Sequence, residues 1–209
     1  MKNVICLVLL ILSIISCGDK KKNVLIIGDS ISIGYTPFVA ESLKSVADVF
    51  HNPGNAASTK HTVDSIPNWI KEKNWDVIVF NYGLHDLCYR NDKNKKDKIN
   101  GKQQVPLPDY EQNLNKILNI LSSTNAKIIF VNTTYIPCNE PGRRNGDELI
   151  YNKTAEKVMN ENDISICDLH KVSIDVHKCY GKGERDVHYY EKGYKELAKT
   201  VVKAIKSEL

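Results

Sequence analysis

The sequence shows no strong excess of charge of either sign. It carries 29 Lys and Arg residues against 25 Asp and Glu residues, a formal net charge of +4 over 209 residues. Proteins that bind nucleic acids usually concentrate basic charge far more strongly than this, so we expect no nucleic-acid partner. The sequence also lacks internal repeats and any linker rich in proline and glycine. We therefore expect one domain, long enough to bury a sizeable α/β core.

Cysteine is scarce and irregularly spaced. None of the six cysteines belongs to a Cys-x-x-Cys pair, which argues against a structural zinc site. Nothing in the residues points to another metal or to an organic cofactor. In an exported protein, the four cysteines that follow the N-terminal segment allow three disulfide pairings, among which the sequence does not choose. These four are Cys88, Cys138, Cys167 and Cys179.

The longest apolar run lies at the N-terminus. Lys2 precedes residues 4–15, a run shorter than the about 20 residues that a helix needs to cross a bilayer. A basic start, a short apolar run and a small residue at its end are typical of a secretory signal peptide, which we expect over residues 1–16. The alternative is an uncleaved N-terminal anchor helix.

The end of this segment, Ile14-Ile15-Ser16-Cys17, resembles a relaxed bacterial lipoprotein box. The resemblance implies cleavage before Cys17 and acylation of that cysteine, which would attach the protein to a membrane through lipid. Residues 17–22 would then form a tether to a domain over residues 23–209. The expected location is the bacterial cell envelope, at the periplasmic or outer-membrane face.

A strand pattern that ends at Gly28-Asp29-Ser30 organises the rest of the chain. Residues 24–27 have the length and β-branched content of a strand buried on both faces, and a helix can begin at Ile31. Ser30 lies at the turn between them, where its Oγ stands clear of the sheet beside the N–H groups of the helix start. This position suits a nucleophile, although the same tripeptide is also ordinary turn and N-cap chemistry.

Strand and helix patterns alternate along the chain, which predicts a parallel sheet covered on both faces by helices. Residues 88–108 are polar and aperiodic and are predicted to form a long loop, whereas residues 171–185 are ambiguous. Further strands are expected at residues 48–50, 75–81, 126–131 and 164–168. Helices are expected at residues 31–46, 63–71, 109–123 (with Asp109 as the cap), 148–159 and 190–209.

Polar residues and glycines follow the first four predicted strands. Ser30, Gly54, residues 83–86 and Asn132 stand at these strand ends, and the carboxyl ends of parallel strands meet at one edge, where sites form. A nucleophilic serine needs a base to take its proton. Among six histidines, His188 stands immediately before the closing helix, where a loop can return it to this edge.

Together these residues resemble the SGNH hydrolase family, also called GDSL esterases. Gly28-Asp29-Ser30 resembles the first block of the family, Gly54 the second, Gly83-Leu84-His85-Asp86 the third and Asp186-Val187-His188 the last. The resemblance implies a flavodoxin-like three-layer α/β/α sandwich with a five-stranded parallel sheet. It also implies a serine esterase that works through a seryl-acyl intermediate.

The family resemblance assigns a role to each matching residue. Ser30 would be the nucleophile, and His188 would be the general base and then the acid. The backbone N–H groups of Ser30 and Gly54 and the side chain of His85 would hold the oxyanion. Asp186 would orient His188, and further contacts with the substrate are expected from Asp29, Asn55, Asp86 and Arg143.

Two positions depart from the family pattern. His85 stands where the family usually has asparagine; its neutral imidazole can donate one N–H, and the alternatives are a two-donor hole or a contact with the leaving group. Arg185 stands three residues before His188, where the family has aspartate. Asp186 can still reach His188 from an extended loop, and the alternative is a Ser-His dyad whose histidine is oriented by a backbone carbonyl.

The substrate class is predicted from the loops. The two long loops contain no apolar run of the kind that a long acyl chain would need, which favours an O-acetyl group on a carbohydrate. Arg143 and Arg144 suit an anionic substrate group, although surface arginines usually remain solvated. The alternatives are a lipase or lysophospholipase on the same fold, an inactive carbohydrate-binding lipoprotein, and acyl transfer to a sugar.

Overall fold

The structure is a computed structural model that describes residues 20–209. The expected signal peptide and the lipidation at Cys17 lie outside the described residues. Five parallel strands form one sheet in the order β2-β1-β3-β6-β7, which confirms the predicted five-stranded α/β fold. The strands are β1 (Lys22–Ile27), β2 (Ala47–His51), β3 (Val77–Phe80), β6 (Lys127–Val131) and β7 (Ser165–Cys167).

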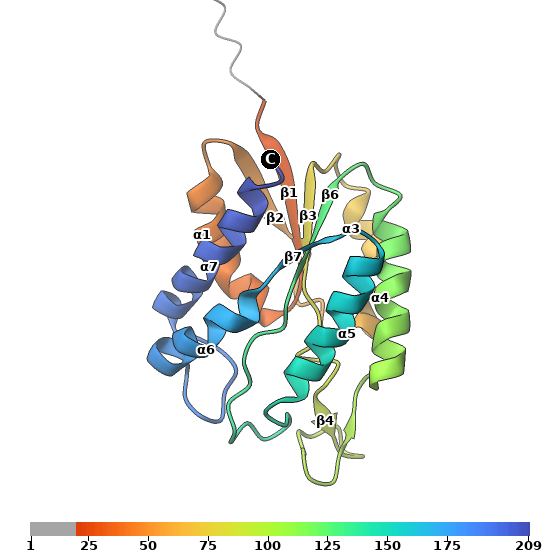
Figure 1. Cartoon of the computed structure of the whole chain (residues 1–209), viewed down its shortest axis with the longest axis vertical. Helices are drawn as coiled ribbons and strands as arrows, with labels where there is room; N and C mark the ends of the chain where they lie inside the picture. Colours follow the sequence, from red (N-terminus) through yellow and green to blue (C-terminus); the bar gives the residue numbers. More distant parts are fainter. Residues whose placement is uncertain (1–19) are drawn as a thin grey trace, which may run out of the picture.

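Helices cover both faces of this sheet, as Figure 1 shows. One layer contains α1 (Ser30–Leu43), α6 (Leu169–Tyr180) and α7 (Glu191–Lys206), with α7 packed against both other helices. The other layer contains α2 (Thr59–Thr62), α3 (Ile66–Ile70), α4 (Leu107–Leu121) and α5 (Asp147–Glu161). Within residues 20–209, no helix combines the length and the apolar character that crossing a membrane requires.

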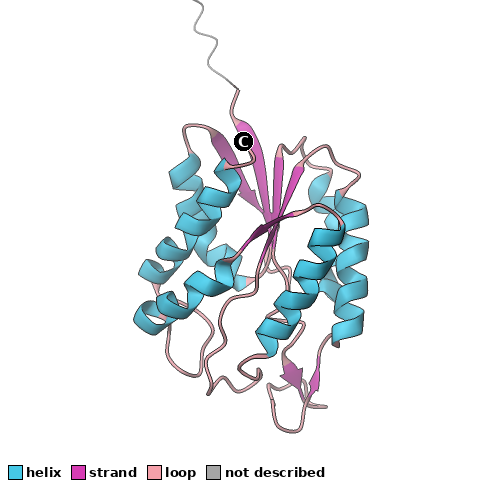
Figure 2. Cartoon of the chain, viewed as in Figure 1, coloured by secondary structure: helices cyan, strands magenta, loops and turns pink. Residues whose placement is uncertain are grey.

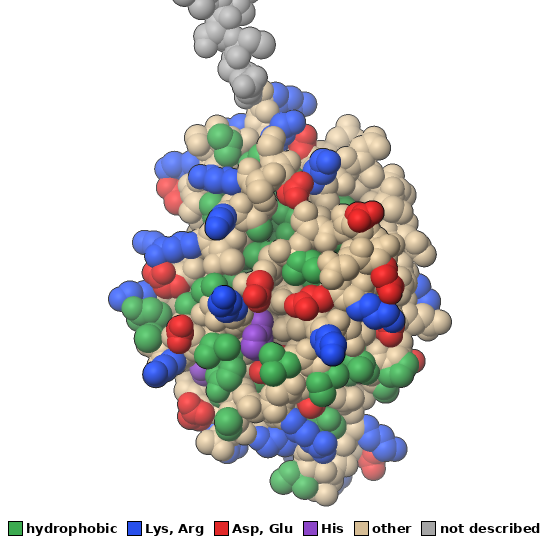
Figure 3. All heavy atoms as spheres, in the orientation of Figure 1, with side chains coloured by type: hydrophobic (Ala, Val, Ile, Leu, Met, Phe, Trp, Pro, Cys, Tyr) green, Lys and Arg blue, Asp and Glu red, His purple; other side chains and the backbone are tan. Residues whose placement is uncertain are grey.

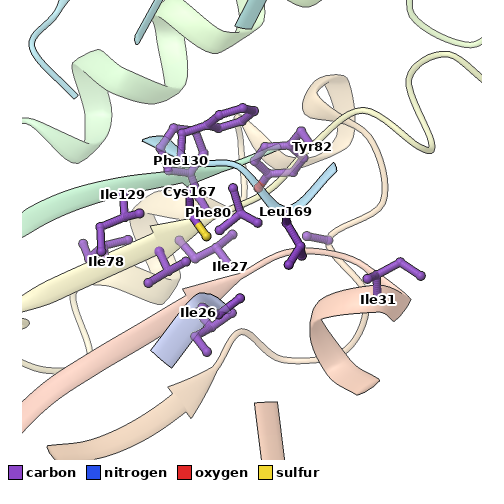
Figure 4. Close-up of a cluster of buried hydrophobic side chains, with 14 of the residues drawn as sticks. Ile26, Ile27, Ile31, Ile78, Phe80, Tyr82, Ile129, Phe130, Cys167 and Leu169 are labelled. Carbon is purple, nitrogen blue, oxygen red and sulfur yellow. The ribbon is translucent and has the colours of Figure 1, made fainter. Parts of the chain in front are cut away.

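The core lies between the sheet and the two helix layers. All four residues of β3 and the last four of β1 are buried, because helices cover the sheet on both sides. Figure 4 shows side chains such as Ile27, Phe80 and Phe130, which come from neighbouring strands of the sheet, in this core. Full burial of such a side chain contributes about 1.5–3 kcal/mol, so the strands hold their carboxyl ends in fixed positions.

Several predicted elements differ in the structure. The helix expected at residues 63–71 is shorter in the structure, where α3 covers residues 66–70 and α2 precedes it. Pro67 has no backbone N–H to donate and occupies the first turn of α3, where none is needed. The ambiguous residues 171–185 lie largely in α6, whose start Asp168 caps by accepting from Lys171 N–H at 3.2 Å. Asp109 is not the cap of α4: Pro106 occupies that position, and Asp109 lies in the first turn.

The predicted long loop also contains secondary structure. Two short antiparallel strands, β4 (Tyr89–Arg90) and β5 (Lys102–Gln103), form a separate ribbon, which Figure 2 shows apart from the main sheet. The hydrophobic periodicity of strands is not visible in pieces only two residues long. The four cysteines left open for pairing, Cys88, Cys138, Cys167 and Cys179, are all free thiols.

A buried carboxylate holds the loop after β3 against α2. Asp86 is fully buried, and its Oδ1 accepts hydrogen bonds from the N–H of Thr59 at 2.9 Å and from its hydroxyl at 2.5 Å. Its Oδ2 has no hydrogen-bond partner among residues 20–209. Burial raises the pKa of Asp86 to about 7, although the bonds from Thr59 oppose the shift.

This raised pKa predicts a pH-dependent stability. Folded Asp86 keeps its proton up to about pH 7, whereas the carboxyl of the unfolded chain titrates near 3.8. The contribution of Asp86 is therefore complete below about pH 4 and is lost as the pH rises through about 7. Asp86→Asn keeps the oxygen that faces Thr59 and cannot titrate. We expect the unfolding free energy of the wild type to fall relative to that of the variant over this range, as measured by urea titration; parallel curves would contradict this.

Candidate active site

The first strand delivers Ser30 to the carboxyl edge of the sheet. Asp29 caps α1, since its Oδ1 accepts from the N–H of Ile31 at 2.9 Å. Ser30 is the first residue of α1, so its own N–H belongs to the helix-start groups that have no partner within the helix. Gly28 is required here, because a Cβ at this position would lie 2.7 Å from the Oγ of Ser32.

Ser30, His188 and Asp186 lie in one line of hydrogen bonds. Ser30 Oγ is 2.8 Å from Nε2 of His188, and Nδ1 of the same ring is 2.5 Å from Oδ1 of Asp186. A carboxylate only accepts hydrogen bonds, so Nδ1 carries the proton and Nε2 is free to accept the serine proton. The shift of the aspartate to two residues before His188 therefore does not prevent its contact with the ring.

The loop geometry also keeps Asp186 ionised. Its Oδ1 accepts a second hydrogen bond, from the backbone N–H of His188 at 3.0 Å. Partial burial opposes the charge, but the bonds from the backbone and the ring of His188 outweigh it and hold the pKa of Asp186 below its usual value. An ionised Asp186 stabilises the imidazolium that forms when His188 takes a proton.

His177 holds the backbone of this loop, and the sequence analysis missed it. Its Nε2 donates to the carbonyl oxygen of Asp186 at 2.7 Å. The ring is 6% exposed and lies between the rings of Tyr135 and Tyr189, with centroids 5.6 and 5.4 Å away. Gly181 makes room for it, since a Cβ there would lie 2.6 Å from the imidazole. Asp168 is a residue type typical of a helix N-cap. It could have indicated that a helix begins there and includes His177.

The second block is tied to the first by Asn52. Its Oδ1 accepts from the N–H of Gly28 at 2.8 Å, and its Nδ2 donates to the carbonyl of Gly54 at 3.2 Å. Gly54 has φ +65°, a left-handed conformation that favours glycine. Within the described part of the chain, the backbone N–H groups of Ser30 and Gly54 donate to no backbone carbonyl.

A second Ser-His contact also joins these two blocks. Ser32 Oγ lies 2.7 Å from Nε2 of His51 and 2.8 Å from the carbonyl of Asp29. Nδ1 of His51 in turn lies 2.8 Å from the carbonyl of Asn52. Ser32 is fully buried, so its hydroxyl connects the start of α1 with the Gly54 loop and is not a second nucleophile.

The third block places His85 next to the first block. Nε2 of His85 is 4.0 Å from Oδ2 of Asp29. Two side chains hold the backbone of this block in place. Arg143 donates to the carbonyl of Leu84 and Gln104 donates to that of His85, each at 2.7 Å. Burial lowers the pKa of His85, so the ring is neutral at pH 7 and carries one N–H donor.

The residues expected to contact the substrate lie in different surroundings. Asn55 is exposed beside Gly54, and its Oδ1 accepts from the N–H of Ala57 at 2.8 Å. Asp29 is buried between the helix start and His85. Asp86 and Arg143 are buried as well, and substrate contact by either residue stays a prediction. Asp86 faces Thr59, and Arg143 is 5% exposed and pairs with buried Glu140 at 2.9 Å.

Comparison with known proteins identifies the fold in solved structures. The acetyl xylan esterase AlAXEase aligns with a TM-score of 0.71 and 19% identity, over 88% of this chain and 99% of that one. A lipase/acylhydrolase from Enterococcus faecalis gives 0.71 and 17%, over 89% and 96% of the two chains. Axe2, an acetylxylan esterase from Geobacillus stearothermophilus, gives 0.69 and 17%, over 88% and 94%. No curated protein matches the chain.

The family follows from the sequence itself. The family model for GDSL-like lipases and acylhydrolases matches residues 24–201, from β1 into α7. The match includes all four blocks that the structure brings to one edge of the sheet. The chain therefore belongs to the GDSL-like lipase/acylhydrolase family and is a carboxylic ester hydrolase.

Proposed function

We propose that this protein is a serine esterase that removes O-acetyl groups from a carbohydrate. The observation that carries the proposal is the hydrogen-bonded line from Ser30 through His188 to Asp186. Ser30 attacks the ester carbonyl carbon while Nε2 of His188 takes the hydroxyl proton. When the tetrahedral intermediate collapses, the C–O bond to the alcohol breaks, and the alcohol leaves with the proton from His188. Water then releases the acetyl group by the same steps in reverse.

The negative charge on the intermediate needs donors beside Ser30. We assign these to the N–H groups of Ser30 and Gly54, whose loops Asn52 ties together. His85 is the candidate third donor, because its neutral ring lies beside the first block. In this assignment the histidine replaces the amide donor that the family usually places here.

Two observations bear on the acyl group. AlAXEase and Axe2 are named as acetyl xylan esterases, which supports acetate. A hollow of about 300 Å³ beside Gly54 is lined in part by Ile33 and Pro37, and this favours the alternative of a lipase or lysophospholipase that takes a longer chain. The two readings differ in chain-length preference, which can be measured directly.

We further propose that the protein is exported and held by lipid at Cys17 in the bacterial cell envelope, at the periplasmic or outer-membrane face. The signal-like residues 1–16 support this. Lys22 begins β1 at the edge of the sheet opposite Ser30, and Figure 1 shows the start of β1 and β4 at opposite ends of the molecule. An anchor there would direct the site away from its own membrane, which favours a polymeric carbohydrate over membrane lipid.

The first test is hydrolysis of p-nitrophenyl acetate by the chain from Gly18 onward. We expect Ser30→Ala and His188→Ala each to lower kcat by at least about 10³-fold, and Asp186→Asn by about 10²–10⁴-fold. Ser42→Ala, an exposed serine near the end of α1, is the matched control and should retain full activity. Activity that survives in Ser30→Ala would contradict the mechanism. An inactive parent that binds oligosaccharides would favour the binding-lipoprotein alternative.

The same assay, run with nitrophenyl esters of increasing length, separates the substrate classes. We expect kcat/KM to be highest for acetate. Faster hydrolysis of esters with about eight or more carbons would favour the lipase reading, since longer chains gain from burial of each CH₂. In that case Ile33→Ala should lower the rate for the long esters more than for acetate.

The proposed role of His85 as an oxyanion donor can be tested with two substitutions. His85→Ala removes the donor and should lower kcat by about 10–10³-fold with little effect on KM. His85→Asn supplies an amide N–H donor at the same position and should recover part of the loss. Thermal unfolding of both variants checks that the loop remains folded. If His85→Ala is as active as the wild type, the hole has two donors.

His177 can be tested as a positioning residue. His177→Phe keeps an aromatic ring between Tyr135 and Tyr189 but cannot donate to Asp186. We expect kcat to fall by about tenfold, the equivalent of one hydrogen bond, with KM nearly unchanged. In an Asp186→Asn background the same change should lower kcat by a smaller factor, because the carboxylate that His177 positions is already absent. Equal losses in both backgrounds would mean that His177 acts independently of Asp186, which would contradict the positioning role.

A further inference from the structure

The net charge of the protein is concentrated in one short segment. The basic ribbon, defined as residues 88–104, contains six basic and two acidic side chains, a net charge of +4 that equals the charge of the whole chain. All other residues together therefore sum to zero. Figure 3 shows Lys and Arg side chains at the lower end of the molecule, where Figure 1 places β4. The basic side chains are Arg90, Lys93, Lys95, Lys96, Lys98 and Lys102.

The basic ribbon is held in a defined position. The N–H of Tyr89 donates to the carbonyl of Gly142 at 2.7 Å, and Arg144 lies over the Tyr89 ring at 4.3 Å while donating to the carbonyl of Lys98 at 3.0 Å. Lys96 pairs at 2.8 Å with Glu140, which is fully buried. These contacts fix the ribbon against the loop that follows β6, so its charges occupy a constant place.

Most of this charge is available to a ligand. Lys93, Lys95 and Lys102 are exposed, and within residues 20–209 none of their side-chain ammonium groups has a hydrogen-bond acceptor or an acidic partner. Arg90 donates only to the carbonyl of Asn94 at 2.8 Å, and its Nε is buried with no partner in the described chain. Of the six cations, Lys96 alone has a carboxylate partner in this part of the chain.

The basic ribbon adjoins the candidate active site. It begins two residues after Asp86, and at its end Gln104 donates to the carbonyl of His85 at 2.7 Å. Its charge also acts on that block: burial lowers the pKa of His85 most, and Arg90 and Lys96 lower it further against the opposing effect of Asp29. The basic ribbon therefore lies directly beside the block that carries His85.

We propose that the basic ribbon binds the carboxylates of an anionic carbohydrate polymer, such as a chain containing uronic acid units, and so selects acetyl esters on that polymer. The inference rests on the proposed esterase function. Several separate lysines suit repeated carboxylates along a chain, because each ammonium is a hydrated point charge that needs no fixed pairing geometry. Such a surface raises the local concentration of an anionic substrate and the rate of its association.

A polymer fits better than an anionic membrane. The ribbon lies at the end of the molecule opposite Lys22, the end where the chain enters the fold. Its single strongly exposed apolar side chain is Ile99, 80% exposed, whereas insertion into a bilayer uses a larger apolar face. Lipid binding is nevertheless a separate outcome that the experiment distinguishes.

The experiment compares two acetylated polymers that differ in charge: polygalacturonate, which is anionic, and a xylan free of uronic acid, which is uncharged. We expect kcat/KM to be higher on acetylated polygalacturonate and to fall on this substrate alone as NaCl is raised. Replacing Lys93, Lys95 and Lys102 by Glu should lower it there by at least about tenfold, while p-nitrophenyl acetate hydrolysis stays within about twofold. The matched control replaces Lys127, Lys203 and Lys206, exposed at the other end of the molecule, by Glu.

A binding measurement separates this proposal from the esterase function. The Ser30→Ala protein, mixed with unacetylated polygalacturonate, should bind it at low salt and lose that binding when the ribbon lysines are replaced. Absent p-nitrophenyl acetate activity would overturn the esterase function while this measurement still judges the ribbon. Equal loss in the control variant, or binding to anionic phospholipid vesicles with none to the polymer, would overturn the proposal.

Discussion

The hydrogen bond between Ser30 and His188 is the contact on which the candidate site depends, and it joins residues 158 positions apart. It forms because α1 and α7 pack side by side, so the start of one helix lies next to the loop before the other. Gly34 permits this approach, since a Cβ there would lie 2.3 Å from the ring of Tyr194. The catalytic geometry is thus a consequence of helix packing as much as of the loops themselves.

Buried polar side chains fix the loops around that contact. Asn52, Asp86, Arg143 and His177 are each at most 6% exposed, and each bonds the backbone of a loop at the sheet edge. A buried polar group costs free energy unless its hydrogen bonds are satisfied, so each holds one arrangement of its loop strongly. The loops that carry the serine and the histidine thereby have defined positions, which orientation of the reacting groups requires.

The charged groups close to Ser30 and those farther from it have different roles. Close to Ser30, hydrogen bonds keep Asp186 ionised and burial keeps His85 neutral, so each has the protonation state that its proposed role needs. Farther out, the basic ribbon carries a net charge equal to that of the whole protein. Most of its basic side chains have no carboxylate partner in the described chain. Short-range contacts therefore set the chemistry, and the longer-range field is available to select the substrate.

The sequence by itself determined the five strands of the main sheet, their alternation with helices and the four blocks, three at strand ends and one before the last helix, because apolar runs and turn residues are local signals. It also determined the pairing of Ser30 with His188 as a candidate, through the resemblance of those blocks to one family. Only the tertiary structure decided that Asp86 and Arg143 are buried supports, that His177 holds the histidine loop and that residues 88–104 form an ordered ribbon. Each of these depends on contacts between segments distant in the chain, and burial and hydrogen bonding across such distances leave no periodic trace in the sequence.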